Sequence, residues 1–369
     1  MFEVELFDGT RTRRNSLGAF TNGSVTVGRW AGEATFVIPK NTAQPRIDLI
    51  HTRGTRVRIL DEGEPVMTGL ITHRSGTGPV NPTTGFTVSS DARLLHDLLA
   101  WPVPTASLIG QTVAYRTITG PLETVVKTVL QENVTRLGLA VTIAPDQARG
   151  PTVTVQWRFH SIFERLKALL EQHNAMIDVL MDPAGVLQVE YRPGRTIAKP
   201  FDILSGTLSS WEWEDQPATV TRVVVGGQGE GAARKLVSVV SPQREDHWGG
   251  HIIEQFVDAR DIEGTADQPL IDRGWEYLRE GNEKTGVKLG IVSTRERPYG
   301  DAYMVGDLVT VNTGDSRASL TAPLSGVTIT QDDKGRRVDP TVDTIESTQS
   351  TMYRLFSRMD RNVRTLMRR

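Results

Sequence analysis

The sequence has 369 residues, of which 42 are basic and 44 are acidic, with 38% hydrophobic residues and no cysteine. The near-neutral charge excludes a global field that attracts nucleic acid or an anionic membrane. The lack of cysteine excludes disulfides, thiolate zinc sites, iron–sulfur clusters and thiol nucleophiles. This length suits two or three domains. No apolar run reaches the roughly 20 residues that span a bilayer, and the N-terminus does not resemble a signal peptide, so we expect synthesis in a cytoplasm.

Residues 1–98 are predicted to form a first β-barrel module. Apolar and polar residues alternate in five short segments: Phe2–Leu6, Ser24–Gly28, Ala34–Ile38, Arg56–Leu60 and Phe86–Asp91. Turn residues between them are typical of an antiparallel sheet or barrel. Ser75–Gly85, rich in glycine and proline, predicts an exposed loop. Asp91 is expected to cap a short helix that ends near Leu99.

Residues 99–200 predict an inserted α+β domain. A helix is expected over Pro121–Leu137, because its apolar residues recur on one face. A second helix is expected from Ser161 to Asn174, with Ser161 and Glu164 forming a capping box. The segment from residue 176 to residue 191 then reads as a β-hairpin with a turn at Asp182–Gly185.

Residues 201–345 predict a second β-barrel module, with strands around a helix near Gln268–Glu280. This part contains an apparent repeat of an earlier motif. Gly54–Ile59 followed by Thr68–Thr72 is similar to Gly306–Val311 followed by Ser325–Thr330. Each copy predicts a hairpin, and the two copies suggest an internal duplication, with chance similarity as the alternative. The fold class is therefore predicted to be α+β and β-rich.

Residues 346–369 predict a C-terminal amphipathic helix. Apolar residues recur at heptad spacing, although Gln349 occupies one position of the seam. The seam suits either a coiled coil or a helix docked on its own domain, and its candidate oligomerisation residues are Met352, Phe356, Met359, Val363 and Leu366. From Arg354 to Arg369 there are six arginines against one acid, Asp360. These arginines suit a solvated helix face or contact with an acidic partner or nucleic acid.

Three other segments resemble chemical sites, but each has a simpler interpretation. Val225–Gly231 lacks the Lys-Ser/Thr ending of a phosphate loop, so it predicts a flexible connection. Two of the three residues between His247 and His251 are glycines, and no third ligand is evident, so a metal site is not assigned.

The third segment is a pair of tryptophans. Trp211 and Trp213 lie on one side of a strand, which favours an interface strand over a sugar-binding or glycosidase site. Trp211, Trp213 and Trp248 are thus candidate interface residues. No Gly-x-Ser-x-Gly or His-Glu-x-x-His motif is present, and no catalytic, cofactor-binding or metal-binding residue is assigned.

The order of these modules resembles a known family. Tyr299–Val311 is similar to the Tyr-x-x-Gly-Asp-x-Val stretch of minor tail proteins from long non-contractile-tailed phages, chiefly those of actinobacteria. These proteins form the tail-tip or baseplate hub and are similar to the hub of contractile tails. Arg56–Leu60 with Gly69–Ile71 is similar to the first barrel of the family, and Phe163–Tyr191 to its helix-hairpin segment. Together, the motifs extend over most of residues 1–345, whereas the terminal helix has no match.

The resemblance implies a homotrimer in the virion tail tip, in which two tube-like modules per chain form a pseudo-six-fold ring. Such a ring would connect the distal tail protein to three-fold tip components, beside other minor tail proteins. Its channel would hold the tape-measure protein and later pass DNA transiently. The near-neutral charge is compatible with that passage. The alternatives are a tail-associated enzyme that degrades the cell wall and a carbohydrate-binding receptor module.

Overall fold

The computed structural model describes residues 1–39, 41–78, 83–260, 262, 267–281, 284–312 and 319–343. Strands predominate over helices in this part of the chain, which confirms the β-rich α+β class. The chain divides into two compact units: the first comprises Met1–Ser210 with Leu289–Val342, and the second includes Trp211–Lys288. The predicted domain boundaries after residues 98, 200 and 345, and the closure of the β-modules into barrels, stay predictions.

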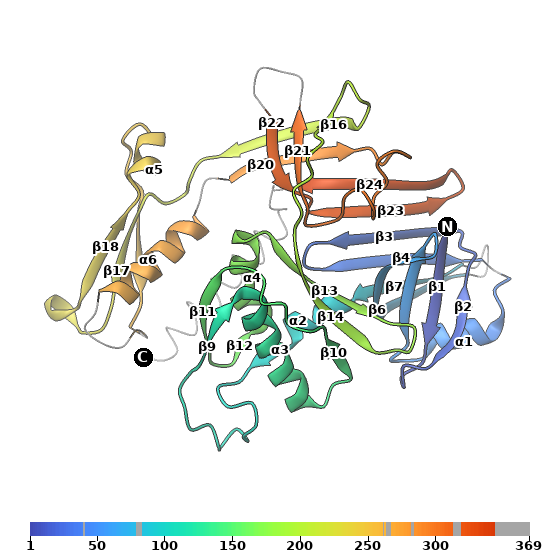
Figure 1. Ribbon diagram of the computed structural model, residues 1–369, viewed down its shortest axis with the longest axis horizontal. Helices are drawn as coiled ribbons and strands as arrows, with labels where there is room; N and C mark the ends of the chain where they lie inside the picture. Colours follow the sequence, from blue (N-terminus) through green and yellow to red (C-terminus); the bar gives the residue numbers. More distant parts are fainter. Residues whose placement is uncertain are drawn as a thin grey trace. The chain divides into compact units, whose positions relative to one another are not determined.

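An 11-stranded sheet runs through the first unit (Figure 1). Its hydrogen-bonded order is β16 (Leu208–Gln216), β20 (Lys284–Ile291), β24 (Gly335–Asp343), β23 (Gly326–Asp332), β3 (Asn22–Gly28), β4 (Gly32–Ile38), β7 (Thr83–Ser90), β6 (Glu64–Thr77), β5 (Arg56–Asp61), β1 (Phe2–Phe7) and β2 (Arg13–Leu17). β23 pairs antiparallel with β3, so that Val327 lies opposite Val27. Segments from opposite ends of the sequence therefore share one sheet. A short helix, α1 (Gln44–His51), precedes β5.

The two copies of the repeated motif pair differently. In the first copy, β5 pairs with β6, as predicted. In the second copy, β21 (Leu308–Asn312) pairs with β22 (Ser319–Pro323), whereas β23 pairs with β24 and β3. The predicted second hairpin is therefore wrong, because β22 is nearer in sequence and occupies the position beside β21. The copies share one local feature: Gly54 and Gly306 have φ values of +82° and +90°, which favour glycine.

The predicted helices and hairpin of the inserted region are confirmed. Its elements are η1 (Asp91–Arg93), α2 (Leu94–Asp97), β8 (Leu99–Ala100), β9 (Arg116–Pro121), α3 (Leu122–Leu137), β10 (Val141–Ile143), β11 (Thr152–Trp157), β12 (His160–Ser161), α4 (Ile162–Gln172), β13 (Ala175–Met181) and β14 (Leu187–Pro193). The predicted apolar face of α3 is buried in one core with Leu166 of α4 and Val189 of β14. Periodicity thus placed the side chains that join the helices to the hairpin.

The predicted capping box of α4 is wrong. Ser161 precedes the helix, but its side chain makes no capping hydrogen bond. Ser161 belongs to β12, which pairs with β8. The N–H of Ile162 therefore donates to the carbonyl oxygen of Leu98 at 3.0 Å, and tertiary structure satisfies a donor at the helix start.

Two predictions near β7 also need correction. Asp91 lies inside η1 and is not the capping residue; its carboxylate accepts hydrogen bonds from Arg56 and from the Thr68 hydroxyl, the latter at 2.6 Å. The loop predicted over Ser75–Gly85 is largely strand, because β6 and β7 remain paired as far as Thr77 and Thr83.

A smaller sheet contains β15 (Phe201–Asp202), β21 and β22.

The second unit is built on a three-stranded sheet. Its elements are β17 (Arg222–Gly226), η2 (Gly231–Ala233), β18 (Leu236–Val240), α5 (Pro242–His247), β19 (Glu254–Asp258) and α6 (Gln268–Glu280), and the strand order is β18-β17-β19. The predicted helix α6 is confirmed. The glycine-rich segment connects β17 to β18, and its Gly227 N–H donates to the Lys235 carbonyl oxygen at 2.8 Å. The segment is thus the connection of a hairpin, where the sequence predicted a flexible connection.

α6 covers one face of this sheet. Leu270 and Leu278 share a core with the apolar side chains of that face, including Val239. The helix backbone approaches the sheet at Gly274, where an added Cβ would lie 2.5 Å from Val239 Cγ2. No helix among the described residues is long and apolar enough to cross a membrane.

Candidate interaction surface

The face of the β18-β17-β19 sheet opposite α6 is largely open to solvent, and we call it the open face. Three side chains lie side by side across its middle: Ser238, Val224 and Phe256. Leu236 lies on the same face at the end of β18. Leu236 and Phe256 are 58% and 55% exposed. Such exposure of large apolar side chains on adjacent strands is typical of an interaction surface.

The Phe256 ring is fixed in place by its neighbours. A Cβ added to Gly226 would lie 2.6 Å from Phe256 Cζ and 2.7 Å from Arg234 Cζ, so both groups lie over this glycine. The Arg234 guanidinium carbon is 5.2 Å from the Phe256 ring centroid. Arg234 also donates to the carbonyl oxygens of Gly226 and Gly227 at 2.9 and 3.1 Å. The ring is therefore held as a flat apolar platform.

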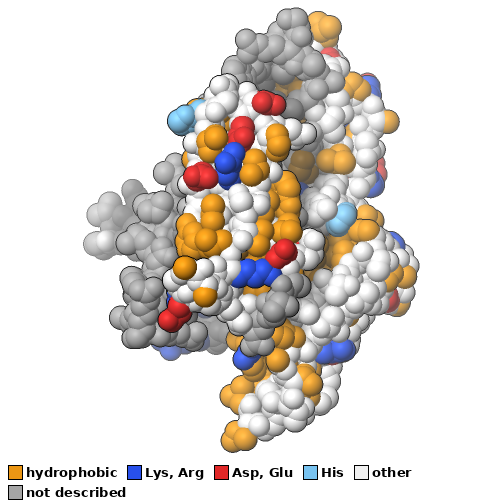
Figure 2. All heavy atoms as spheres, turned by 90° about the vertical axis from the view of Figure 1, so that its left-hand side faces the viewer, with side chains coloured by type: hydrophobic (Ala, Val, Ile, Leu, Met, Phe, Trp, Pro, Cys, Tyr) orange, Lys and Arg blue, Asp and Glu red, His pale blue; other side chains and the backbone are white. Residues whose placement is uncertain are grey.

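Charged side chains border the open face in pairs. Arg234 binds Asp258 at 2.6 Å, and Arg222 binds Glu245 at 3.0 Å and lies 3.9 Å from Glu254. The side chains of Glu254 and Asp258 are 58% and 38% exposed, compared with 29% and 13% for Arg222 and Arg234. Asp258 also lies 3.8 Å from Arg260, whose side chain is 46% exposed, so the border of the open face exposes both acidic and basic groups. Figure 2 views the molecule from the side where β17 and β18 lie and shows hydrophobic side chains with charged groups beside them.

The structure describes one of the three predicted interface tryptophans. Trp248 follows α5 and is 37% exposed, while its Nε1 donates to the Ala218 carbonyl oxygen at 2.9 Å. Trp211 and Trp213 belong to β16, but their side chains lie outside the described part. The candidate oligomerisation residues lie outside it too: Met352, Phe356, Met359, Val363 and Leu366. All these assignments stay predictions. Within the described residues, no group of three His, Asp or Glu side chains is placed to hold a metal ion.

The loop between β8 and β9 is a second exposed apolar region. Residues 101–115 include no charged side chain, and Leu108 and Ile109 are 66% and 100% exposed. Gln111 holds the loop in shape: its Oε1 accepts from the Val103 N–H at 2.8 Å, and its Nε2 donates to the Val103 carbonyl oxygen at 2.9 Å. A braced loop therefore presents two apolar side chains to solvent.

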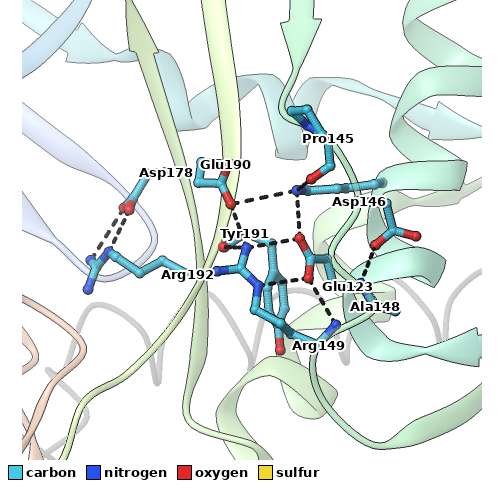
Figure 3. A network of polar contacts seen from close by, with 10 residues as sticks. Glu123, Pro145, Asp146, Ala148, Arg149, Asp178, Glu190, Tyr191 and Arg192 are labelled. Carbon is cyan, nitrogen blue, oxygen red and sulfur yellow. Dashed lines mark hydrogen bonds and ion pairs between the residues drawn. The ribbon is translucent and has the colours of Figure 1, made fainter.

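A network of ion pairs joins α3 to β14 (Figure 3). The carboxylate of the fully buried Glu123 accepts from Lys127 at 2.6 Å and from the Arg149 guanidinium at 2.8 and 2.9 Å. Arg149 also donates to Glu190 and to the Tyr191 carbonyl oxygen, both at 2.6 Å. Hydrogen bonds from Arg149, and then from Lys127, lower the pKa of Glu123 to about 2. A carboxylate held so firmly in its ionised form is unsuited to proton transfer near neutral pH, and its role is structural.

The stretch that carries the family resemblance is also structural. The buried Asp307 accepts from the backbone N–H groups of Arg195 and Met304 at 3.0 and 2.9 Å, and from the Arg195 guanidinium at 2.7 Å. The buried Tyr303 packs edge-on against Phe201, with ring centroids 5.1 Å apart. These contacts fix the segment before β15 to the segment before β21. The motif therefore marks a junction in the fold.

Three tail proteins of known structure share this architecture. The 43 kDa tail protein of prophage MuSo2 from Shewanella oneidensis is 15% identical, with a TM-score of 0.58, over 93% of this chain and 98% of that one. The tail protein from Neisseria meningitidis MC58 is 14% identical, with a TM-score of 0.54, over 93% of this chain and 96% of that one. The prophage tail protein gp18 from Listeria monocytogenes EGD-e is 10% identical, with a TM-score of 0.51, over 96% of this chain and 98% of that one. The fold is thus that of phage tail proteins.

Residues 3–342 match the family model of the Siphovirus ReqiPepy6 Gp37-like proteins, and the chain belongs to this family. The family is one of siphovirus proteins, and the fold is shared with tail proteins, in agreement with the family resemblance of the sequence. No curated protein matches the chain.

Sequence analysis did not identify the open face. One signal for it was present: Val223, Val224 and Val225 form a continuous apolar run in the central strand. Such a run is typical of a strand that is covered on both faces. Strict alternation of apolar and polar residues is typical of a strand with one face exposed to solvent.

Proposed function

We propose that this tail protein forms a trimeric hub at the tail tip, or baseplate, of a siphophage. Each chain contributes two similar surfaces, and three chains form a pseudo-six-fold ring. The ring connects the six-fold tail tube, through the distal tail protein, to three-fold tip components. Its channel holds the end of the tape-measure protein and then passes DNA.

The family match over residues 3–342, together with the fold of the S. oneidensis and N. meningitidis tail proteins, carries this proposal. The positive-φ glycines at Gly54 and Gly306, each followed by a strand, support the duplication on which a pseudo-six-fold ring depends. The balance of 42 basic and 44 acidic residues suits a channel that must not retain DNA.

We assign the chain a structural role in the virion rather than a catalytic one. Two buried carboxylates, Glu123 and Asp307, are each held by an arginine and by backbone N–H groups, so their contacts explain them without a substrate. Other minor tail and tip proteins are the expected partners. The braced apolar loop of residues 101–115 supports assembly, since exposed apolar side chains on an ordered loop become buried in stable interfaces.

Light scattering of the purified protein tests the trimer. The hub proposal predicts a mass three times the 40.7 kDa of one chain. A monomeric mass at every concentration up to the solubility limit would contradict it.

Replacing Ile109 by aspartate is expected to weaken assembly by tenfold or more. The side chain is fully exposed, so the isolated chain should keep its folding stability. A charge buried at an interface without a partner costs several kcal/mol, and each ~1.4 kcal/mol is tenfold in the association constant. Sedimentation equilibrium of the Ile109→Asp variant measures this change. The matched control is Thr112→Asp, which adds the same charge to the loop but keeps its apolar tip; equal effects of the two variants would exclude the tip as a contact.

A further inference from the structure

The open face of the β18-β17-β19 sheet is uncovered, although the sequence of β17 is typical of a strand that is covered on both faces. β17 carries three consecutive valines, and α6 covers only one of its faces. On the other face, Val224 lies beside Phe256, and Leu236 is more than half exposed. A strand with apolar residues on both faces is stable when both faces are covered.

We propose that residues 346–369 of the same chain form an amphipathic helix that lies on the open face. The seam of this segment consists of five apolar side chains: Met352, Phe356, Met359, Val363 and Leu366. Of the two arrangements that the seam allows, the docked helix has a complementary surface in the described structure. A free coiled coil of about three heptads, with Gln349 in its seam, is marginal by comparison.

The dimensions of the helix and the open face agree. Strands of five residues are about 17 Å long, and three strands are about 10 Å wide. From Met352 to Leu366, a helix would rise about 21 Å, and its diameter with side chains is about 10–12 Å. One helix therefore suffices to cover the apolar middle of the sheet. The second unit would then be a sheet with a helix on each face.

Exposed carboxylates at the border are available to this occupant. The side chains of Glu254 and Asp258 are 58% and 38% exposed, and the basic groups among them are Arg222, Arg234 and the 46% exposed Arg260. The terminal segment has six arginines and one acid between residues 354 and 369. At about 100° per residue, Arg358 and Arg364 project on opposite sides of the seam, about 120° from its centre. Their long side chains can reach the acidic groups on both borders.

The position where the described chain ends is consistent with this docking. β24 ends at Asp343 and is the neighbour of β20 in the large sheet. β20 begins at Lys284, shortly after α6 of the second unit ends at Glu280. The terminal segment thus follows β24, which lies beside β20, the strand in which the chain leaves the second unit.

A double-substitution cycle in the full chain tests the contact. Leu236→Asp and Phe356→Asp are each expected to lower the unfolding midpoint of the second unit by about 3 °C, because each places a charge in the docked interface. The double variant should show little further loss, since either change alone already removes the helix. The control pairs Phe356→Asp with Leu204→Asp. Leu204 is fully exposed between β15 and β16, in the first unit, so the effects of these two substitutions on the midpoint should add. Additive effects of Leu236→Asp and Phe356→Asp would overturn the proposal.

Cross-linking identifies which chain supplies the helix. The protein has no cysteine, so Ser238→Cys with Met359→Cys gives the only two thiols in the full chain. A short bismaleimide is expected to link them within one chain, seen as a faster band of single-chain mass on a denaturing gel. Glu276→Cys, on α6, replaces Ser238→Cys in the control and should give no link. A band of two chains with the Ser238 variant, or equal linking of the Glu276 control, would contradict docking within one chain. Neither readout depends on whether the protein is trimeric. Failure of the docking proposal is therefore distinguishable from failure of the hub proposal.

Discussion

Replacing Gly69 by alanine is expected to lower the free energy of unfolding by about 3 kcal/mol or more. Gly69 lies in β6 opposite Ser90 of β7, and an added Cβ would lie 2.0 Å from the Ser89 carbonyl oxygen. The obstacle is backbone inside a sheet, so relief requires the two strands to separate. Urea unfolding followed by circular dichroism measures the loss.

Gly326→Ala is the matched control, because Gly326 holds the same position in the second copy of the repeated motif. A Cβ there would lie 3.2 Å from the Val27 carbonyl oxygen, so a small adjustment suffices and the loss should stay below about 1 kcal/mol. Comparable losses in the two variants would contradict the different pairing of the two copies.

Replacing Glu123 by alanine is expected to cost about 3–5 kcal/mol, because removal of one partner leaves buried cations uncompensated. Lys127 is buried beside Glu123, and the Arg149 guanidinium donates two hydrogen bonds to its carboxylate. Glu132→Ala, in the same helix, is the control: its pair with Arg116 is partly exposed and should contribute no more than about 1 kcal/mol. Urea unfolding of both variants checks the difference, and equal losses would show that the network contributes no special stability.

The same carboxylate predicts a dependence of stability on pH. Arg149 and Lys127 depress the pKa of Glu123 from its ordinary 4.5 to about 2. A depressed pKa gives stability that is complete above the unfolded value and is lost as the pH falls through the folded value. The stability difference between the native protein and Glu123→Gln should therefore shrink from pH 4.5 to pH 2. A difference that stays constant over this range would contradict the assignment.

Local periodicity explains which elements could be predicted from the sequence. α3, α4, α6 and the β13–β14 hairpin each carry their own 3.6- or 2-residue pattern, so neighbours in sequence were sufficient to define them. The pairings of β21 with β22 and of β3 with β23 could not be read in this way. Many strands here have similar alternation, and the partner is decided by packing between distant segments. The same cause explains the failed cap at Ser161, whose strand pairing with β8 overrides a local signal.

The open face was harder to predict than the fold. Leu236 and Phe256 are each followed by a valine, Val237 and Val257, so the pattern does not tell which face of the sheet is uncovered. The sequence drew attention to Trp248 instead, which is partly exposed and hydrogen-bonded through its indole N–H. Attention to tryptophans alone therefore overlooked a surface that consists of Val224, Leu236 and Phe256.

Electron cryomicroscopy of the tail tip of the phage that encodes this chain is the most direct test of the hub. We predict three copies of the chain around the tail axis, directly below the six-fold tube, with a channel along the axis. Finding the chain in a six-fold ring of the tube, away from the axis as a peripheral fibre, or outside the virion would contradict the proposed role.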